Sequence, residues 1–259
     1  MGNFNSITRD NWRKFAKLAS SLWLFDRDED TSTKKKDFHG AFVRQVSDGL
    51  INRYSPVKGW VLDMFGGSMT TFRSAYELGR NSVSTDIAFK VKKSRTMHLT
   101  HETQHYRYKV SAAHDKYLFA WKENREREFD LTILHPPYYD IIQFSENAMD
   151  LSTFNPLAFR TVMNFVFDNA FKWTKSGGHI ALVFGDVYKK GELLPAYQIA
   201  DLFTQRHGYE ITLKSIITKN MTGNERGKGV NRNLWVYRSL VNGFSVFDTE
   251  HIFIWQKKP

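Results

Sequence analysis

The sequence predicts an α/β fold, in which a mostly parallel sheet carries helices on both faces and an antiparallel hairpin at one edge. Short apolar runs alternate with segments of helical periodicity between residues 41 and 206, which is typical of a wound parallel sheet. The last three strand candidates, 209–217, 234–238 and 251–255, have no helix between them, which indicates antiparallel pairing. Hydrophobic residues make up 41% of the 259 residues, enough to fill the core of such a domain.

Each element follows from its local pattern. Apolar residues recur every three or four positions in the predicted helices, at 5–23, 41–54, 69–78, 157–173 and 194–206. Short apolar runs predict strands at 60–65 and 131–134, and the segments 83–87 and 179–184 are further strand candidates. Ser55-Pro56 ends the second helix, and Gly79 lies where a C-cap glycine is expected. The charged stretch 26–37 has no periodicity and predicts a loop.

Composition excludes several classes of site and of protein. The chain contains no cysteine, so disulfides, thiolate zinc sites, iron–sulfur clusters and cysteine nucleophiles are excluded. No apolar run approaches the roughly 18 residues that span a membrane, and the N-terminal residues lack the apolar stretch of a signal peptide. We therefore expect a soluble, cytoplasmic protein with no membrane partner. Lys and Arg number 37 against 27 Asp and Glu, and this net charge of +10 favours a polyanionic partner such as nucleic acid.

The first candidate site is the turn after the first predicted strand. Asp63 comes at the carboxyl end of that strand and is followed by Gly66-Gly67-Ser68, where glycine lets a ligand approach the backbone. Asp86 ends the next strand, and ligands of wound parallel sheets bind outside the carboxyl ends of the strands. This order predicts a nucleoside site in which Asp86 accepts from both ribose hydroxyls. The alternative is a structural turn capped by Ser68, and the lack of Gly-Lys-Ser/Thr excludes a phosphate loop.

The second candidate site is the segment His135-Pro136-Pro137-Tyr138, which follows a predicted strand. Two prolines remove two backbone donors and fix φ, so their carbonyls are stiff acceptors beside a histidine nitrogen. Such a cluster suits an NH₂ group, and Tyr138 offers a flat face on which a base can stack. The alternative is a proline kink that closes the strand, with His135 as a surface residue.

Both segments resemble those of a known family. Residues 63–71, Asp-Met-Phe-Gly-Gly-Ser-Met-Thr-Thr, resemble the cofactor turn of the amino-methyltransferases that use S-adenosylmethionine, and residues 135–138 resemble their Asp/Asn/Ser-Pro-Pro-Tyr catalytic loop. Residues 38–56 are similar to the segment before this turn in N4-cytosine/N6-adenine DNA methylases. Residues 178–191 resemble a later core strand of this family together with its loop, and residues 251–255 resemble the closing edge strand of the family. The resemblance covers about residues 38–257 and implies a Rossmann-like methyltransferase fold.

The resemblance also implies a set of site residues, and no metal. S-adenosylmethionine would be bound by His39, Asp63, Phe65, Gly66, Gly67, Ser68, Thr70 and Asp86. The catalytic residues would be His135, Pro136, Pro137 and Tyr138. A base flipped out of the double helix would stack on the tyrosine, while the histidine and the first proline carbonyl accept its amine hydrogens. Methyl transfer would then be an in-line displacement that depends on positioning.

The histidine of the second segment is a departure from the family, whose first catalytic position is usually Asp, Asn or Ser. Neutral imidazole offers one acceptor nitrogen and imidazolium offers none. Activity is therefore expected to fall as the pH drops through the pKa of His135. The substitution also leaves open a catalytically inactive subunit that keeps the fold and binds nucleic acid.

Two basic segments are candidates for contact with nucleic acid. Their basic residues are Lys92, Lys93, Arg95 and Arg107 in the segment 89–127, and Arg226, Lys228 and Arg232 in the segment 214–242. His98, His101 and His105 stand at helical spacing, and we assign them to the first basic segment rather than to a metal site. The alternatives are a solvated helix face and an ordinary hairpin tip. We divide the chain into an N-terminal helix and charged loop, 1–37, and a methyltransferase domain, 38–259, with both segments as insertions.

The sequence thus favours a methyltransferase acting on double-stranded DNA at adenine N6 or cytosine N4, with adenine as the first expectation. Because little chain is left for a recognition domain, specificity would come from the basic segments or from a separate recognition subunit. A homodimer and a place in a restriction–modification system are both left open. The alternatives are an RNA base-amine methyltransferase and the inactive subunit, whereas a protein glutamine methylase gives no reason for the net charge.

Overall fold

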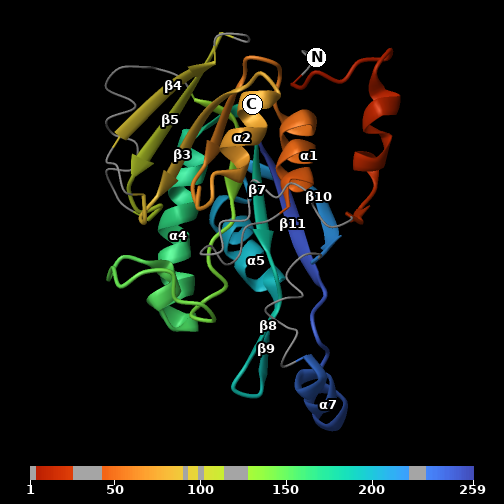
Figure 1. Ribbon diagram of the computed structural model, residues 1–259, viewed down its shortest axis with the longest axis vertical. Coiled ribbons are helices and arrows are strands. Elements are labelled where there is room, and N and C mark those ends of the chain that lie inside the picture. Colours follow the sequence, from red (N-terminus) through yellow and green to blue (C-terminus); the bar gives the residue numbers. More distant parts are fainter. Residues whose placement is uncertain (1–3, 26–42, 90–92, 99–101, 114–127, 222–231) are drawn as a thin grey trace.

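The computed structural model describes residues 4–25, 43–89, 93–98, 102–113, 128–221 and 232–259. Within these ranges it contains a nine-stranded sheet in the order β1-β10-β11-β7-β6-β2-β3-β5-β4 and a separate hairpin, β8-β9 (Figure 1). The strands of the large sheet are β1 (Leu22–Trp23), β2 (Trp60–Asp63), β3 (Asn81–Asp86), β4 (Lys93–His98), β5 (Thr103–Lys109), β6 (Phe129–Leu134), β7 (Thr174–Phe184), β10 (Ile211–Asn220) and β11 (Thr249–Lys257). The hairpin consists of β8 (Val187–Lys189) and β9 (Glu192–Leu194).

The middle of the sheet is parallel, as predicted. The strands β3, β2, β6 and β7 pair in parallel, so their carboxyl ends meet at one edge of the sheet. β11 runs antiparallel to both β7 and β10, which confirms the antiparallel pair expected at one side. At the other side β4 and β5 form a second antiparallel pair, joined in parallel to β3 through β5.

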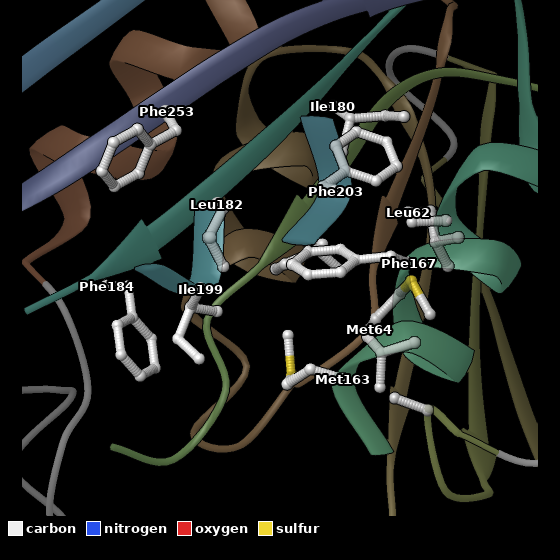
Figure 2. Close-up of a cluster of buried hydrophobic side chains, with 14 of the residues drawn as sticks. Leu62, Met64, Met163, Phe167, Ile180, Leu182, Phe184, Ile199, Phe203 and Phe253 are labelled. Carbon is white, nitrogen blue, oxygen red and sulfur yellow. The ribbon is translucent and has the colours of Figure 1, made fainter. Parts of the chain in front are cut away.

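Helices cover both faces of this sheet. They are α1 (Arg44–Tyr54) and α2 (Thr70–Glu77) on one face, and α4 (Pro156–Trp173) and α5 (Ala196–His207) on the other. Successive side chains of one strand point to opposite faces of the sheet. In β7, Ala181 and Val183 pack in the cluster with α1. Ile180 and Leu182 pack in the cluster with α4 and α5. Figure 2 shows the second cluster, in which apolar side chains of the strands meet those of the two helices.

Local sequence explains where these helices begin and end. Pro156 is the first residue of α4, and the side chain of Asn155 accepts from the Ala158 N–H, so one free backbone donor of the first turn is satisfied. After α2, Gly79 has a φ of +72°, as expected of a glycine that follows a helix.

The predicted helix over 5–23 is wrong in extent and type. The chain forms a 3-10 helix, η1 (Trp12–Ala19), without a buried residue, and then β1, which pairs in parallel with β10. Burial of Trp23 against Gly49 holds this strand to α1, so pairing and packing override the helical spacing of the apolar residues. The predicted loop 26–37 lies outside the described residues, and the division of the chain at residue 37 stays a prediction.

Two further segments differ from the expected secondary structure. The stretch with His98 and His105 forms β4 and β5 instead of a helix, because Tyr106 and Tyr108 alternate into the core at the strand period. The predicted strand 234–238 is part of a helix, α7 (Arg232–Asn242). Here β10 and β11 pair directly with each other, which leaves no place between them for a strand. Among the described residues, no helix is long and apolar enough to cross a membrane.

Candidate active site

The two candidate segments lie at the same edge of the sheet. Asp63 ends β2, Asp86 ends β3, and His135 follows the last residue of β6. The pairing register puts Asp63 beside Ser84 of β3 and Ile133 of β6, so these strand ends are neighbours. The parallel arrangement therefore brings together residues that are more than 70 positions apart in the sequence.

The turn after β2 is tied to the end of β3 by backbone hydrogen bonds. The Gly66 N–H donates to the Thr85 carbonyl at 2.8 Å, and the Gly67 N–H donates to Oδ2 of Asp86 at 2.9 Å. Inside the turn, the Phe65 N–H donates to Oδ1 of Asp63 at 3.0 Å. Both predicted acidic residues thus act on the backbone of the glycine turn, which fixes its shape.

Gly66 is needed in this turn for steric reasons. A Cβ atom at this position would lie 2.9 Å from Cζ of Phe89 and 3.1 Å from Cβ of Ser84. Ser84 belongs to a central strand, so it has no freedom to move away. The glycine allows the turn to lie directly on β3.

We expect Gly66→Ala to lower the free energy of unfolding by about 1–3 kcal/mol, the usual effect of overpacking, and to displace the turn. Urea unfolding checks this. The matched control is Gly191→Ala: nothing lies within 4 Å of a Cβ there, and its φ of +86° makes the change a test of backbone strain alone. If the turn were loosely packed, Gly66→Ala would be harmless and the control would be the more damaging of the two.

Burial raises the pKa of both acidic residues. The pKa of Asp63 rises to about 6 because its carboxyl is buried; the Thr71 hydroxyl and the Phe65 N–H oppose this rise, and Asp86 adds to it. The pKa of Asp86 is also raised by burial, against hydrogen bonds from the Ala88 and Gly67 N–H groups. A ligand that donates hydrogen bonds or carries positive charge would favour the ionised form of both carboxyls.

The second segment forms a compact loop at the end of β6. Nε2 of His135 lies 3.3 Å from the hydroxyl oxygen of Tyr138, and the ring of Tyr138 packs against Phe184 with centroids 4.8 Å apart. Gly185 gives room for that ring, since a Cβ there would lie 2.9 Å from Cε2 of Tyr138. Tyr139 has a φ of +55° and is buried, so it turns the chain away after the loop. Both His135 and Tyr138 keep part of their surface exposed.

A buried ion pair lies behind this loop. Glu250 of β11 and Lys219 of β10 are register partners across the two strands, and their side chains form a salt bridge with 8% and 5% of their surfaces exposed, respectively. Burial and the negative charge of Glu250 raise the pKa of Tyr138 well above its usual value. Sequence reasoning missed both charged residues. No local pattern distinguishes them, because β10 also contains Lys214 and β11 ends in Lys257.

His135 is neutral over the physiological pH range. Burial lowers its pKa to about 4, and the positive charge of Lys219 also lowers it, while Glu250 acts in the opposite direction. The pKa of Glu250 is itself lowered, with Lys219 as the main favourable partner against the cost of burial. An imidazole at this position can therefore act as a hydrogen-bond acceptor at neutral pH.

The remaining predicted residues of the two sites fall as follows. Phe65 packs partly buried against the larger core cluster, and the hydroxyls of Ser68 and Thr70 lie 3.1 Å apart in the turn. Pro136 is buried and Pro137 is half-buried. His39 lies outside the described residues.

The predicted nucleic-acid residues are not brought to one place among the described residues. Lys92, Arg226 and Lys228 lie outside them, and Lys93, Arg95 and Arg232 are described only by their place in β4 and α7. Arg107 is half-buried in β5, and the ring nitrogens of His105 lie 2.8 Å from the Ser82 hydroxyl and 3.0 Å from the Thr103 hydroxyl, in the core. Figure 1 shows β4 and β5 at one side of the sheet, and α7 at the bottom of the view, below the strands of the sheet. No group of His, Asp or Glu residues able to hold a metal ion is found in the described part of the chain.

Comparison with known proteins gives a family match over part of the chain, and a fold. Residues 5–96 match the N6/N4 methylase family, described as DNA methylase. That range contains the glycine turn and Asp86, but it ends before the loop at 135–138. No curated protein sequence matches this chain.

Among solved structures, the chain is similar to TrmN from Thermus thermophilus, with 14% sequence identity and a TM-score of 0.51 over 88% of this chain and 52% of that one. It therefore spans about half the length of TrmN. It is also similar to the N-methyltransferase NodS from Bradyrhizobium japonicum WM9 in complex with S-adenosyl-l-homocysteine, with 10% identity and a TM-score of 0.48 over 96% and 99% of the two chains. An rRNA methylase from Streptococcus thermophilus has 6% identity and a TM-score of 0.46 over 86% and 100%.

At 14% identity, the likeness to TrmN shows the fold alone. The resemblance to the N4-cytosine/N6-adenine DNA methylases is confirmed over residues 5–96, and the described chain as a whole has a Rossmann-like methyltransferase fold.

Proposed function

We propose that this protein transfers a methyl group from S-adenosylmethionine to an exocyclic amine of a flipped base in DNA, at adenine N6 or cytosine N4, with adenine as the first expectation. The observation that carries the proposal is the shared sheet edge. A glycine turn held by Asp63 and Asp86 lies there next to a loop with a neutral histidine, two prolines and a tyrosine. The glycine turn suits a nucleoside cofactor, and the loop suits an amine on a flat ring.

The acidic residues of the turn fit the cofactor. Asp63 and Asp86 are buried carboxyls with raised pKa values, so a ligand with an ammonium group and ribose hydroxyls would supply the donors that favour their ionised forms. Asp86 would hold the ribose and Asp63 the part of the cofactor next to the glycines. S-adenosylmethionine supplies the methyl group on a sulfonium, and the turn supplies its position. Phe65, Ser68 and Thr70 are the further residues that we assign to it.

The loop after β6 would hold the amine. Tyr138 provides a ring for stacking, and its own ring is fixed against Phe184 and Gly185. His135 and the carbonyl of Pro136 would accept the two amine hydrogens, which directs the nitrogen lone pair at the methyl carbon. The amine would exchange one hydrogen for the methyl group that S-adenosylmethionine supplies, and the proton would pass to solvent, to which His135 and Tyr138 are partly exposed. No covalent intermediate with the protein is involved.

The net charge of +10 supports nucleic acid as the partner, and the family match over residues 5–96 favours DNA. A homodimer or a separate recognition subunit would supply sequence recognition. The test is methyl transfer from labelled S-adenosylmethionine to duplex DNA, single-stranded DNA and RNA in parallel, followed by nucleoside mass analysis. Label in N6-methyladenine or N4-methylcytosine of DNA is expected. Label only in RNA would overturn the choice of substrate, and no binding of the cofactor would favour an inactive subunit.

The pKa values predict two separate pH effects. We expect the affinity for S-adenosylmethionine to fall below about pH 6, because protonation of Asp63 removes the carboxylate that the cofactor needs. At saturating cofactor, kcat should stay level down to about pH 5, because His135, with a pKa of about 4, is still neutral there. Binding and turnover measured from pH 5 to 8 check both effects. A fall in kcat centred at pH 6.5 would mean that His135 titrates as an exposed histidine does.

A further inference from the structure

Two adjacent isoleucines are exposed next to the loop that would hold the target amine. Ile141 and Ile142 keep 50% and 43% of their surfaces exposed, although Tyr139 just before them is buried. They follow Tyr138 by three and four positions, and the Ile141 N–H donates to the Tyr138 carbonyl at 3.4 Å. Single exposed apolar side chains are common on protein surfaces, so the place of this pair beside the proposed base-stacking ring is what distinguishes it.

The segment 140–150 holds these two side chains on a supported backbone. At its start, Asp140 forms a salt bridge with Lys189 of β8. Further along, the Phe144 N–H donates to the Ser152 hydroxyl at 2.9 Å. At its end, the buried Asp150 accepts from the N–H and the hydroxyl of Ser152 at 2.9 and 2.7 Å. Both ends of the segment are therefore fixed while the isoleucines stay in contact with solvent.

The charges around this segment favour nucleic acid as the partner that covers the isoleucines. Of its three acidic residues, Asp140 is paired with Lys189 and Asp150 is buried, which leaves Glu146 exposed. Lys190 is exposed at the turn of the β8–β9 hairpin, directly after the paired lysine. With a net charge of +10, a second copy of this chain would bring like charges together, whereas a polyanion is attracted.

We propose that Ile141 and Ile142 form a wedge that enters double-stranded DNA and fills the space from which the target base has been flipped. The inference rests on the proposed function and names the residues that carry out one part of it. Flipping a base costs the stacking of that base in the helix, and an apolar side chain in the gap restores part of the contact. Isoleucine suits this task because its branched side chain has few rotamers to lose.

The wedge explains why the isoleucines and Tyr138 belong to one short segment. The ring on which the extruded base stacks and the side chains that replace the base in the helix must act at the same nucleotide. A backbone hydrogen bond from Ile141 to the Tyr138 carbonyl keeps the two groups within one turn of the chain. A wedge on a distant element would have to be brought to the same nucleotide by the fold.

The first test measures binding and needs no methyl transfer. A duplex with one abasic site already contains a gap, so a wedge can enter it without unstacking a base. We expect the native protein to bind this duplex about tenfold more tightly than the same duplex without the abasic site, by fluorescence anisotropy. The double variant Ile141→Ser with Ile142→Ser should bind both duplexes equally. No preference in the native protein, or the same preference in the double variant, would overturn the proposal.

The second test measures methylation of paired and mispaired targets in duplexes that carry the methylated sequence. We expect the double variant to methylate the paired target about tenfold more slowly than the native protein does, and the mispaired target at nearly the native rate, because a mispaired base costs least to extrude. Its affinity for S-adenosylmethionine should stay within about twofold of the native value. An equal loss of rate on both duplexes would show that the isoleucines support the fold of the site, which contradicts a wedge.

Met149→Ser is the matched control. Met149 lies in the same segment and keeps 47% of its surface exposed, but it is seven positions beyond Ile142. This variant should keep both the preference for the abasic duplex and the native rate on the paired target. A loss as large as that of the double variant would mean that the effect is not specific to the isoleucines.

The two tests separate the wedge from the proposed function. If the native protein methylates no nucleic acid, the proposed function fails, and the abasic duplex still decides whether the isoleucines enter DNA. The competing occupant is a second copy of this chain, which sedimentation of the free protein would detect. A dimer that the double variant lacks, together with equal binding of the two duplexes, would assign the isoleucines to a protein interface and overturn the wedge.

Discussion

Asp63→Ala is expected to lower the affinity for S-adenosylmethionine by about 100-fold, because hydrogen bonds to a charged group contribute about 1.5–3 kcal/mol each and the change removes the whole carboxylate. Asp63 also accepts the Phe65 N–H at 3.0 Å, so the turn itself loses a support. Calorimetric titration with the cofactor measures the loss.

Asp63→Asn is the control for this result. The amide keeps the shape of the side chain and an oxygen that can accept from the Phe65 N–H, but it carries no charge. If the carboxylate binds the cofactor, the asparagine variant binds it more weakly, while its stability stays close to the native value. Its affinity should also no longer decrease as the pH falls below about 6, because the amide does not titrate. Native affinity in both variants would mean that the cofactor binds elsewhere.

Tyr138→Ala is expected to lower kcat/KM for nucleic acid by about 10- to 100-fold, the effect of removing an aromatic ring on which a base stacks. Affinity for S-adenosylmethionine should change little, because the tyrosine lies on the loop after β6 and not on the glycine turn. Steady-state kinetics with varied DNA, together with cofactor titration, separate the two quantities.

Tyr138→Phe completes this comparison. It keeps the ring and its contact with Phe184, so stacking is preserved, and it removes the hydroxyl that lies 3.3 Å from Nε2 of His135. Tyr138→Ala should therefore lower kcat/KM for nucleic acid more than Tyr138→Phe does. Equal losses of cofactor affinity and turnover in Tyr138→Ala would show that the ring supports the fold of the site instead of a base.

The sequence was sufficient to predict the parallel core of the fold and the glycine turn. In β2 and β6 the chain is buried on both faces, so short apolar runs mark these two strands, and the acids at the ends of β2 and β3 mark the ligand edge. These signals are local. They depend on neighbours in sequence, such as the glycines next to Asp63.

What the sequence could not predict depends on contacts between distant segments. The strand β1 forms because β10 lies beside it, and residues 234–238 form part of a helix because β11 already pairs with β10. The ion pair behind Tyr138 joins residues 219 and 250, and only the register of β10 on β11 shows that they are partners. A single charged residue within a predicted strand does not indicate which residue it pairs with.

The place of β11 between β7 and β10 has a consequence for synthesis of the protein. The strand β11, residues 249–257, comes after both of its neighbours in the sequence, although it lies between them in the sheet. A nascent or truncated chain that stops before this strand exposes the edges of β7 and β10, which are open to pairing with other chains. Such a chain is expected to aggregate, so correct folding of the sheet waits for the synthesis of residues 249–257.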